Sequence, residues 1–148
     1  MRNNIYAAYV KAIGNNDGSA MGGAYIITDR TEVWKSSKIS KIGTRAYEME
    51  LRAILGVVSS LPDGAMVNIY TNNKLLESVN CLKSALADAK FYDLKKSFLN
   101  EKKRLKGVNV VYKRKSCNNV YLNSANEMAK DEFLNLCHEK GITNRITA

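Results

Sequence analysis

The chain has 148 residues, of which 45% are hydrophobic and 25% charged, as is typical of a globular domain with one sizeable core. No apolar run approaches the ~20 residues of a membrane span. The three widely spaced cysteines form no C-x-x-C pair, which argues against a zinc site or a disulfide framework. The formal net charge of +9 favours polyanionic partners. We therefore expect one domain over residues 1–148, with flexible ends at 1–3 and about 142–148, in a cytoplasmic protein with reduced thiols.

The first third of the chain predicts three antiparallel strands, at residues 4–13, 21–28 and 32–39. The turn-forming segment 14–18 (Gly-Asn-Asn-Asp-Gly) separates the first two strands, and the pair 29–30 (Asp-Arg) makes a tight connection to the third. This pattern indicates a meander of neighbouring strands.

A helix is predicted over residues 44–61. Its apolar positions recur at spacings of three and four, which places them on one face: Tyr47, Leu51, Ile54, Val58 and Leu61. Thr44 is predicted to cap this helix, and Pro62 with Gly64 ends it.

The second half of the chain alternates strands and helices. A strand is predicted at 65–71, followed by helical segments at about 73–80, 82–88 and 92–106. Lys106-Gly107 introduces a strand at 108–112, and a polar loop leads to a last helix over about 123–140, with Gly141 as its C-cap. Because the 44–61 crossover is right-handed, the 65–71 strand should lie parallel to the first strand, which is central.

Three stretches in this order resemble the type-1 ribonuclease H family over nearly the whole chain. They are the glycine-rich strand 22–27 (GGAYII), the helix segment 49–54 (MELRAI) and the strand end 69–73 (IYTNN). Weaker similarities lie at 92–94 and 126–129. The resemblance implies a ribonuclease H-like α/β fold, with a five-stranded mixed sheet of three antiparallel and then parallel strands, flanked by helices.

The resemblance also implies a chemistry. Members of this family use four carboxylates to hold two Mg²⁺ ions that cut the RNA strand of an RNA–DNA hybrid, and paired hard cations require clustered negative oxygens. Carried over position by position, Glu50 matches the helix glutamate, whereas the other carboxylates fall at Ala8, Asn72 and Asn126. With three of four carboxylates absent, we expect no metal or other cofactor and no efficient cleavage. Mg²⁺ or Mn²⁺ would be needed only if the protein is an enzyme.

Simpler interpretations of these residues stay open. Without the family pattern, Glu50 is a polar residue at the solvated edge of a helix, and Asn72 is a strand-to-helix cap, since asparagine is a favoured N-cap residue. Asp17 copies a family Asp-Gly-Ser segment, but Gly22 follows it by only five positions, where the family has about ten residues between the two.

Basic residues concentrate between Lys83 and Lys115, where eleven basic and three acidic side chains give a net charge of +8. A solvated helix face usually mixes both signs, so this segment favours nucleic acid. The resemblance places a basic protrusion here that grips the DNA strand. The predicted nucleic-acid-binding residues are Arg45, Lys74, Lys90, Lys95, Lys96, Lys102, Lys103, Arg104, Lys113, Arg114 and Lys115.

The sequence thus predicts a nucleic-acid-binding protein that engages RNA–DNA hybrid or duplex RNA without efficient cleavage. Two alternatives remain. One is a ribonuclease H that cuts hybrids with a divalent metal, natural or inactivated by engineered substitutions. The other is a protein–protein interaction scaffold, with a homodimer through the free sheet edge at 32–39.

Overall fold

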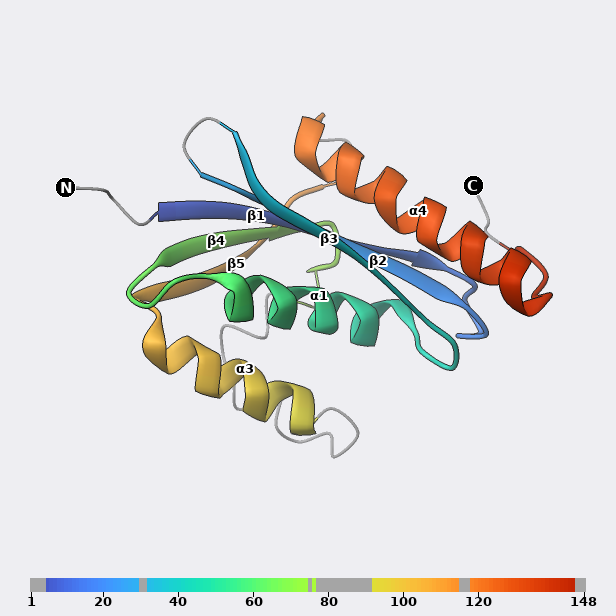
Figure 1. Ribbon diagram of the computed structural model, residues 1–148, viewed down its shortest axis with the longest axis horizontal. Coiled ribbons are helices and arrows are strands. Elements are labelled where there is room, and N and C mark those ends of the chain that lie inside the picture. The colour runs from blue at the N-terminus through green and yellow to red at the C-terminus, as the bar shows by residue number, and fades with distance from the viewer. Residues whose placement is uncertain (1–4, 30–31, 75, 77–91, 115–117, 146–148) are drawn as a thin grey trace.

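The computed structural model describes residues 5–29, 32–74, 76, 92–114 and 118–145 (Figure 1). Along the chain run β1 (Ile5–Gly14), β2 (Met21–Thr28), β3 (Val33–Lys41), α1 (Ala46–Ser60), β4 (Met66–Thr71), α3 (Tyr92–Arg104), β5 (Gly107–Tyr112) and α4 (Val120–Lys140). The predicted helical segments at 73–80 and 82–88 lie mostly outside the described residues. No helix within the described ranges is long and apolar enough to cross a membrane.

The five strands form one mixed sheet in the order β3-β2-β1-β4-β5. β1 pairs with β2, and β2 with β3, in antiparallel ladders, whereas β4 runs parallel to both β1 and β5. The predicted fold class, the central first strand and the parallel fourth strand are therefore confirmed. β3 lies at one edge of the sheet, and dimerisation through this edge stays a prediction.

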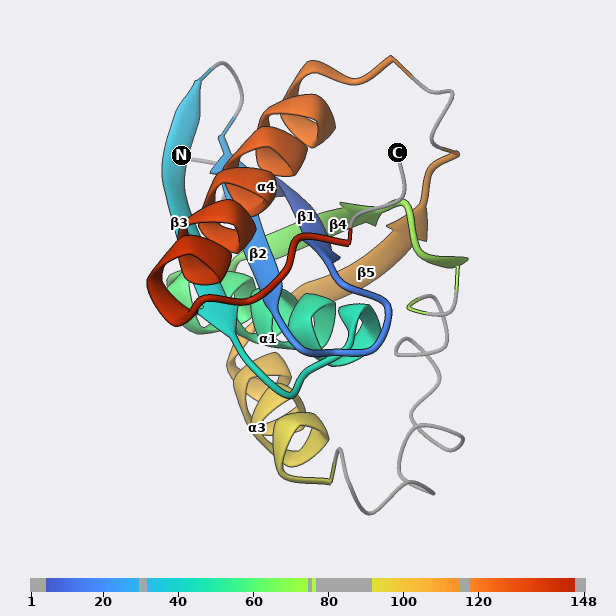
Figure 2. The same ribbon diagram turned by 90° about the vertical axis from the view of Figure 1, so that its right-hand side faces the viewer.

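Helices cover the two faces of the sheet unequally. α1 packs on one face with α3 beside it, and α4 crosses the other face over β1, β2 and β3 (Figures 1 and 2). The α1 side holds the main core, where Ala8 and Val10 of β1 meet Ile54 and Val58 of the helix. Every residue of β2 is buried, as expected for a strand covered on both faces.

β2 and α4 approach each other so closely that only glycine fits between them. A Cβ at Gly22 would lie 2.1 Å from the carbonyl oxygen of Ala129 and 2.6 Å from the nitrogen of Phe133. Phe133 is completely buried there, in a smaller core with Ala20, Leu136 and Cys137. The glycine-rich start of the predicted second strand therefore allows α4 to pack directly on the sheet.

The ends of the two long helices differ from the prediction. Arg45 precedes the first turn of α1 and makes no side-chain capping bond, while the hydroxyl of Thr44 donates to the Glu48 carboxylate at 2.9 Å. The predicted Thr44 cap is thus wrong, because Glu48 captures this hydroxyl. α4 begins three residues earlier than predicted, since the Asn119 side chain accepts from the backbone N–H groups of Tyr121 and Leu122. Gly141 is the predicted C-cap, in the left-handed conformation at φ 65°.

Residues 142–145 are tied to the turn between β1 and β2, within a segment expected to be flexible. The buried Asn15 side chain donates to the carbonyl of Thr143 at 2.9 Å and accepts from the Arg145 N–H at 2.7 Å. Figure 2 shows this stretch crossing back from the end of α4. No periodic sequence pattern reports such a side-chain clamp, so it could not be predicted from the sequence.

Candidate functional site at the carboxyl ends of β1 and β4

The register of the two central strands decides which side chains meet. Ala8 pairs with Ile69 and Tyr9 with Tyr70, so continuing the parallel ladder brings Lys11 level with Asn72. The Lys11 Nζ indeed donates to the Asn72 Oδ1 at 2.9 Å. Ala8 lies three positions earlier, about 10 Å along the strand, and its side chain is buried in the α1-side core. The structure therefore brings Lys11, and not Ala8, to the end of β4.

Asn72 connects three strand ends. It accepts from Lys11, and its Nδ2 donates to the carbonyl oxygen of Lys113 at 2.7 Å. The Lys113 N–H in turn donates to the carbonyl of Thr71 at 2.8 Å. An amide can accept and donate at once, whereas a carboxylate can only accept. Asparagine therefore suits this position for a structural reason beyond a helix cap.

Among the described residues, Glu50 is the one carboxylate of the cluster, and it is 4% exposed. The Thr71 hydroxyl donates to its Oε2 at 3.2 Å, so the side chain points from α1 to the end of β4. Burial raises the pKa of Glu50 to about 7, while the Lys11 ammonium, the Thr71 hydroxyl, the Ala12 N–H and the Asn73 side chain oppose that rise. The interpretation of Glu50 as a residue of a solvated helix edge is wrong.

The residues of this cluster do not fit a two-metal centre. Among the described residues, no group of three or more histidine, cysteine, aspartate or glutamate side chains is placed to hold a metal ion. Lys11 adds a positive charge that interacts with Glu50. A divalent ion about 4 Å from an ammonium would meet roughly 8 kcal/mol of repulsion at an effective dielectric constant near 20.

Two further residues that the family resemblance singled out, Asn126 and Asp17, lie on α4 and in the β1–β2 turn. Asn126 sits half-buried on α4, about 7 Å along the helix from Tyr121, whose ring stacks on Tyr9 of β1 at a centroid distance of 5.1 Å. Asp17 lies in the β1–β2 turn, where its carboxylate accepts from the Ser19 N–H at 2.9 Å and pairs with Arg145 at 3.5 Å. Asp17 thus lies in a turn, as the sequence suggests, and the structure adds its contact with the C-terminal stretch.

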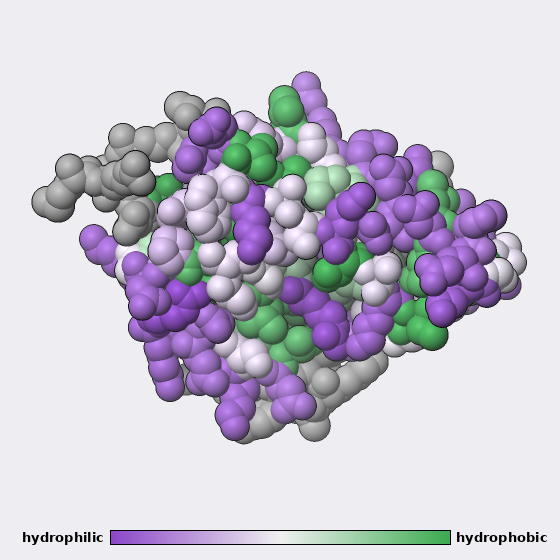
Figure 3. Space-filling view, in the orientation of Figure 1, coloured by the Kyte–Doolittle hydropathy of each residue, from purple (hydrophilic) through white to green (hydrophobic). Residues whose placement is uncertain are grey.

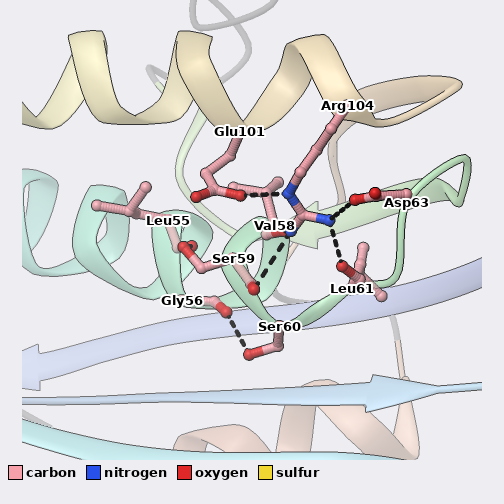
Figure 4. Close-up of polar contacts among 9 residues, drawn as sticks. All are labelled: Leu55, Gly56, Val58, Ser59, Ser60, Leu61, Asp63, Glu101 and Arg104. Atoms are coloured by element: carbon pink, nitrogen blue, oxygen red, sulfur yellow. Dashed lines mark hydrogen bonds and ion pairs between the residues drawn. The ribbon is translucent and has the colours of Figure 1, made fainter.

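Two predicted phosphate-binding residues serve the fold instead. Lys95 is only 4% exposed. Arg104 bonds to the carboxylates of Glu101 and Asp63 at 2.6 and 3.0 Å, and to carbonyls at the end of α1 (Figure 4). Phosphate binding by these two residues stays a prediction that their burial and contacts disfavour, because charge counting along a helix does not show which cations the fold uses. Lys90 and Lys115 lie outside the described residues.

The other predicted basic residues form two groups. Arg45, Lys74, Lys113 and Arg114 are exposed, and the last three directly follow β4 and β5, next to the Lys11–Asn72 pair. The Lys113 ammonium lies 5.5 Å from the centre of the Tyr70 ring. The second group is on α3, where Lys96 and Lys103 are exposed and Lys102 is half-buried. Hydrophilic residues dominate the surface over α3 (Figure 3).

Sequence reasoning missed Lys11, which the structure places at the centre of the cluster. The signal was available in the alternation of β1, because Tyr9, Lys11 and Ile13 share a face and a lysine between two large apolar residues is unusual there. Its neighbour across the sheet could be known only from the strand register.

The sheet order, the mixed strand directions and the placement of the helices define a ribonuclease H-like fold. The chain is similar to the N-terminal RNase H domain of Rv2228c from Mycobacterium tuberculosis, solved as a fusion with maltose-binding protein. The TM-score is 0.75 at 12% identity, over 92% of this chain and 98% of that one. It is also similar to LC11-RNase H1 in complex with an RNA/DNA hybrid, with a TM-score of 0.73 at 14% identity, over 93% and 99% of the chains. No protein-family model matches the sequence, and no curated protein matches it.

Proposed function

We propose that this protein binds a nucleic-acid duplex, RNA–DNA hybrid or duplex RNA, without cleaving it efficiently. One observation carries the proposal: a lysine bonded to an asparagine stands beside a single buried carboxylate where the resemblance implies a cluster of carboxylates. Exposed cations surround that cluster. Positive charge suits a phosphate backbone, whereas metal-assisted cleavage needs the missing negative oxygens.

The binding face consists of the cations around the strand ends. Lys74, Lys113 and Arg114 are exposed there, and the backbone of Lys113 is fixed by hydrogen bonds to Asn72 and Thr71. Such a fixed backbone limits the freedom that the cations would lose when they contact phosphates. The hybrid bound to LC11-RNase H1, a protein with the same fold, supports a duplex as the ligand.

The absence of cleavage follows from charge. Two-metal chemistry needs oxygens that attract both ions, and Lys11 and Asn72 supply one positive and one neutral group in their place. The same change raises the positive potential at this edge of the sheet. Loss of catalysis and retention of phosphate affinity are therefore compatible.

The test is a fluorescence-anisotropy titration of labelled RNA–DNA hybrid, duplex RNA and duplex DNA, from about 50 to 200 mM salt, with a parallel gel assay in Mg²⁺ and Mn²⁺. Lys113→Gln/Arg114→Gln removes two cations of the proposed face. The matched control, Lys35→Gln/Lys140→Gln, removes the same charge from exposed positions on β3 and at the end of α4.

We expect binding that weakens with salt, and no cleavage product. The Lys113/Arg114 variant should lower the magnitude of the log K against log salt slope by about 2, because each lost phosphate contact removes roughly 0.9. Equal losses in the control variant would reject this face as the binding site. If the unmodified protein forms more cleavage product than a Glu50→Gln variant, the proposed lack of cleavage is wrong. If the protein binds no duplex, the protein–protein interaction scaffold is the interpretation that remains.

A further inference from the structure

A positive charge lies in the strand-end cluster, where the family resemblance implies a metal site. Lys11 extends from the carboxyl-end half of β1 toward the end of β4, where its Nζ lies 2.9 Å from the Asn72 Oδ1. Its charge also acts on the Glu50 carboxyl, which α1 brings to the same point. The Lys11 ammonium thus faces the neutral amide oxygen of Asn72 and the acidic carboxyl of Glu50.

We infer that the Lys11 ammonium is a built-in cation that replaces a divalent metal ion at this site. The cluster takes no Mg²⁺ or Mn²⁺, and it is held together without them. This inference concerns the site of the proposed function, but its test uses no nucleic acid, so the two can fail separately.

The hydrogen bonds around Lys11 connect the elements of this site without a metal ion. Lys11 joins β1 to Asn72, and Asn72 joins the end of β4 to the Lys113 carbonyl after β5, at 2.7 Å. Glu50 adds α1 to this network through the Thr71 hydroxyl. Four elements therefore meet at one lysine-centred network.

The groups at this site explain both why an ammonium fits there and why a divalent ion does not. An ammonium offers three hydrogen-bond donors and one charge, which suits amide and carboxylate oxygens at hydrogen-bond distance. A divalent ion instead needs several oxygens close to it, and dehydrates only when carboxylates balance its charge. Within the part of the chain that the structure describes, Glu50 is the single carboxylate at this point, and Lys11 already interacts with it.

Three proteins test whether Lys11 keeps a divalent ion out of the cluster. Mn²⁺ binding is measured by the loss of the free-ion electron paramagnetic resonance signal, on the unmodified protein, on Asn72→Asp, and on Lys11→Asp/Asn72→Asp. Circular dichroism checks that each variant is folded. If the double variant does not fold, Lys11→Gln/Asn72→Asp takes its place, since glutamine removes the charge without adding another acid.

We expect no saturable Mn²⁺ binding by the unmodified protein. Asn72→Asp should also fail to bind, because its new carboxylate pairs with Lys11. The double variant should bind Mn²⁺ at least about tenfold more tightly than Asn72→Asp, because the repulsive ammonium is gone and a carboxylate takes its place.

Three results would overturn the inference. The first is saturable binding by the unmodified protein that Glu50→Gln abolishes. The second is equal Mn²⁺ affinity of Asn72→Asp and of the variant that also lacks Lys11. The third is the absence of Mn²⁺ binding by a folded variant without the lysine charge.

Discussion

Replacing Glu50 with glutamine should remove a pH dependence of stability that the buried carboxyl imposes. Burial raises the pKa of Glu50 from 4.5 to about 7. Because the folded-state pKa is the higher one, the stabilising contribution is fully present below pH 4.5 and is lost as the pH rises through about 7. At about 1.4 kcal/mol per pH unit between these values, the loss is about 3 kcal/mol.

The assay is urea unfolding of both proteins at several values between about pH 4 and pH 8. Glutamine cannot ionise, so the free energy of unfolding of Glu50→Gln relative to the unmodified protein should rise by about 3 kcal/mol from the acid to the alkaline end. The comparison cancels other titrating groups and any fixed cost of the amide. A difference that stays constant with pH would refute the reasoning, and would mean that Lys11 and Thr71 keep Glu50 ionised in the folded state.

Three further substitutions test contacts that hold α1, α3 and α4 in place elsewhere in the fold. Arg104→Met should lower the free energy of unfolding, measured in urea, by about 2 kcal/mol, because it leaves carbonyls and carboxylates without their hydrogen-bond donor. The control Lys103→Met, one residue earlier and exposed, should change this free energy by under about 0.5 kcal/mol. Gly22→Ala should lower the free energy of unfolding by about 3 kcal/mol, since its Cβ would overlap the Ala129 carbonyl. An unchanged urea midpoint would show that α4 can move away from β2. Asn119→Ala should cost about 1 kcal/mol through the lost cap of α4, whereas Asn119→Gly should cost only a few tenths.

Local pattern alone predicted most of the fold. The apolar stripe of α1, the strand at β2 and the glycine stop after α4 follow from spacing and composition, because the forces involved act within a few residues. The order of elements then restricts the sheet, since a right-handed crossover after three antiparallel strands places β4 beside β1.

The basic residues show where sequence reasoning ends. A run of cations on α3 predicts a phosphate-binding face, yet Lys95 is buried and Arg104 is occupied by Glu101, Asp63 and the end of α1. The partners of Arg104 on α1 and at Asp63 lie more than forty residues away in the chain. No local pattern can separate such an arginine from one that faces solvent.

The sequence by itself determined the class of fold, the position of Glu50 on α1 and the amide at the end of β4. Only the tertiary structure decided that Lys11 lies level with Asn72, while Ala8 belongs to the core three positions away. The physical reason is that a shift along a parallel ladder leaves each strand's own sequence pattern unchanged but alters every partner across it. The identity of the charge at this site therefore depends on pairing between segments about sixty residues apart.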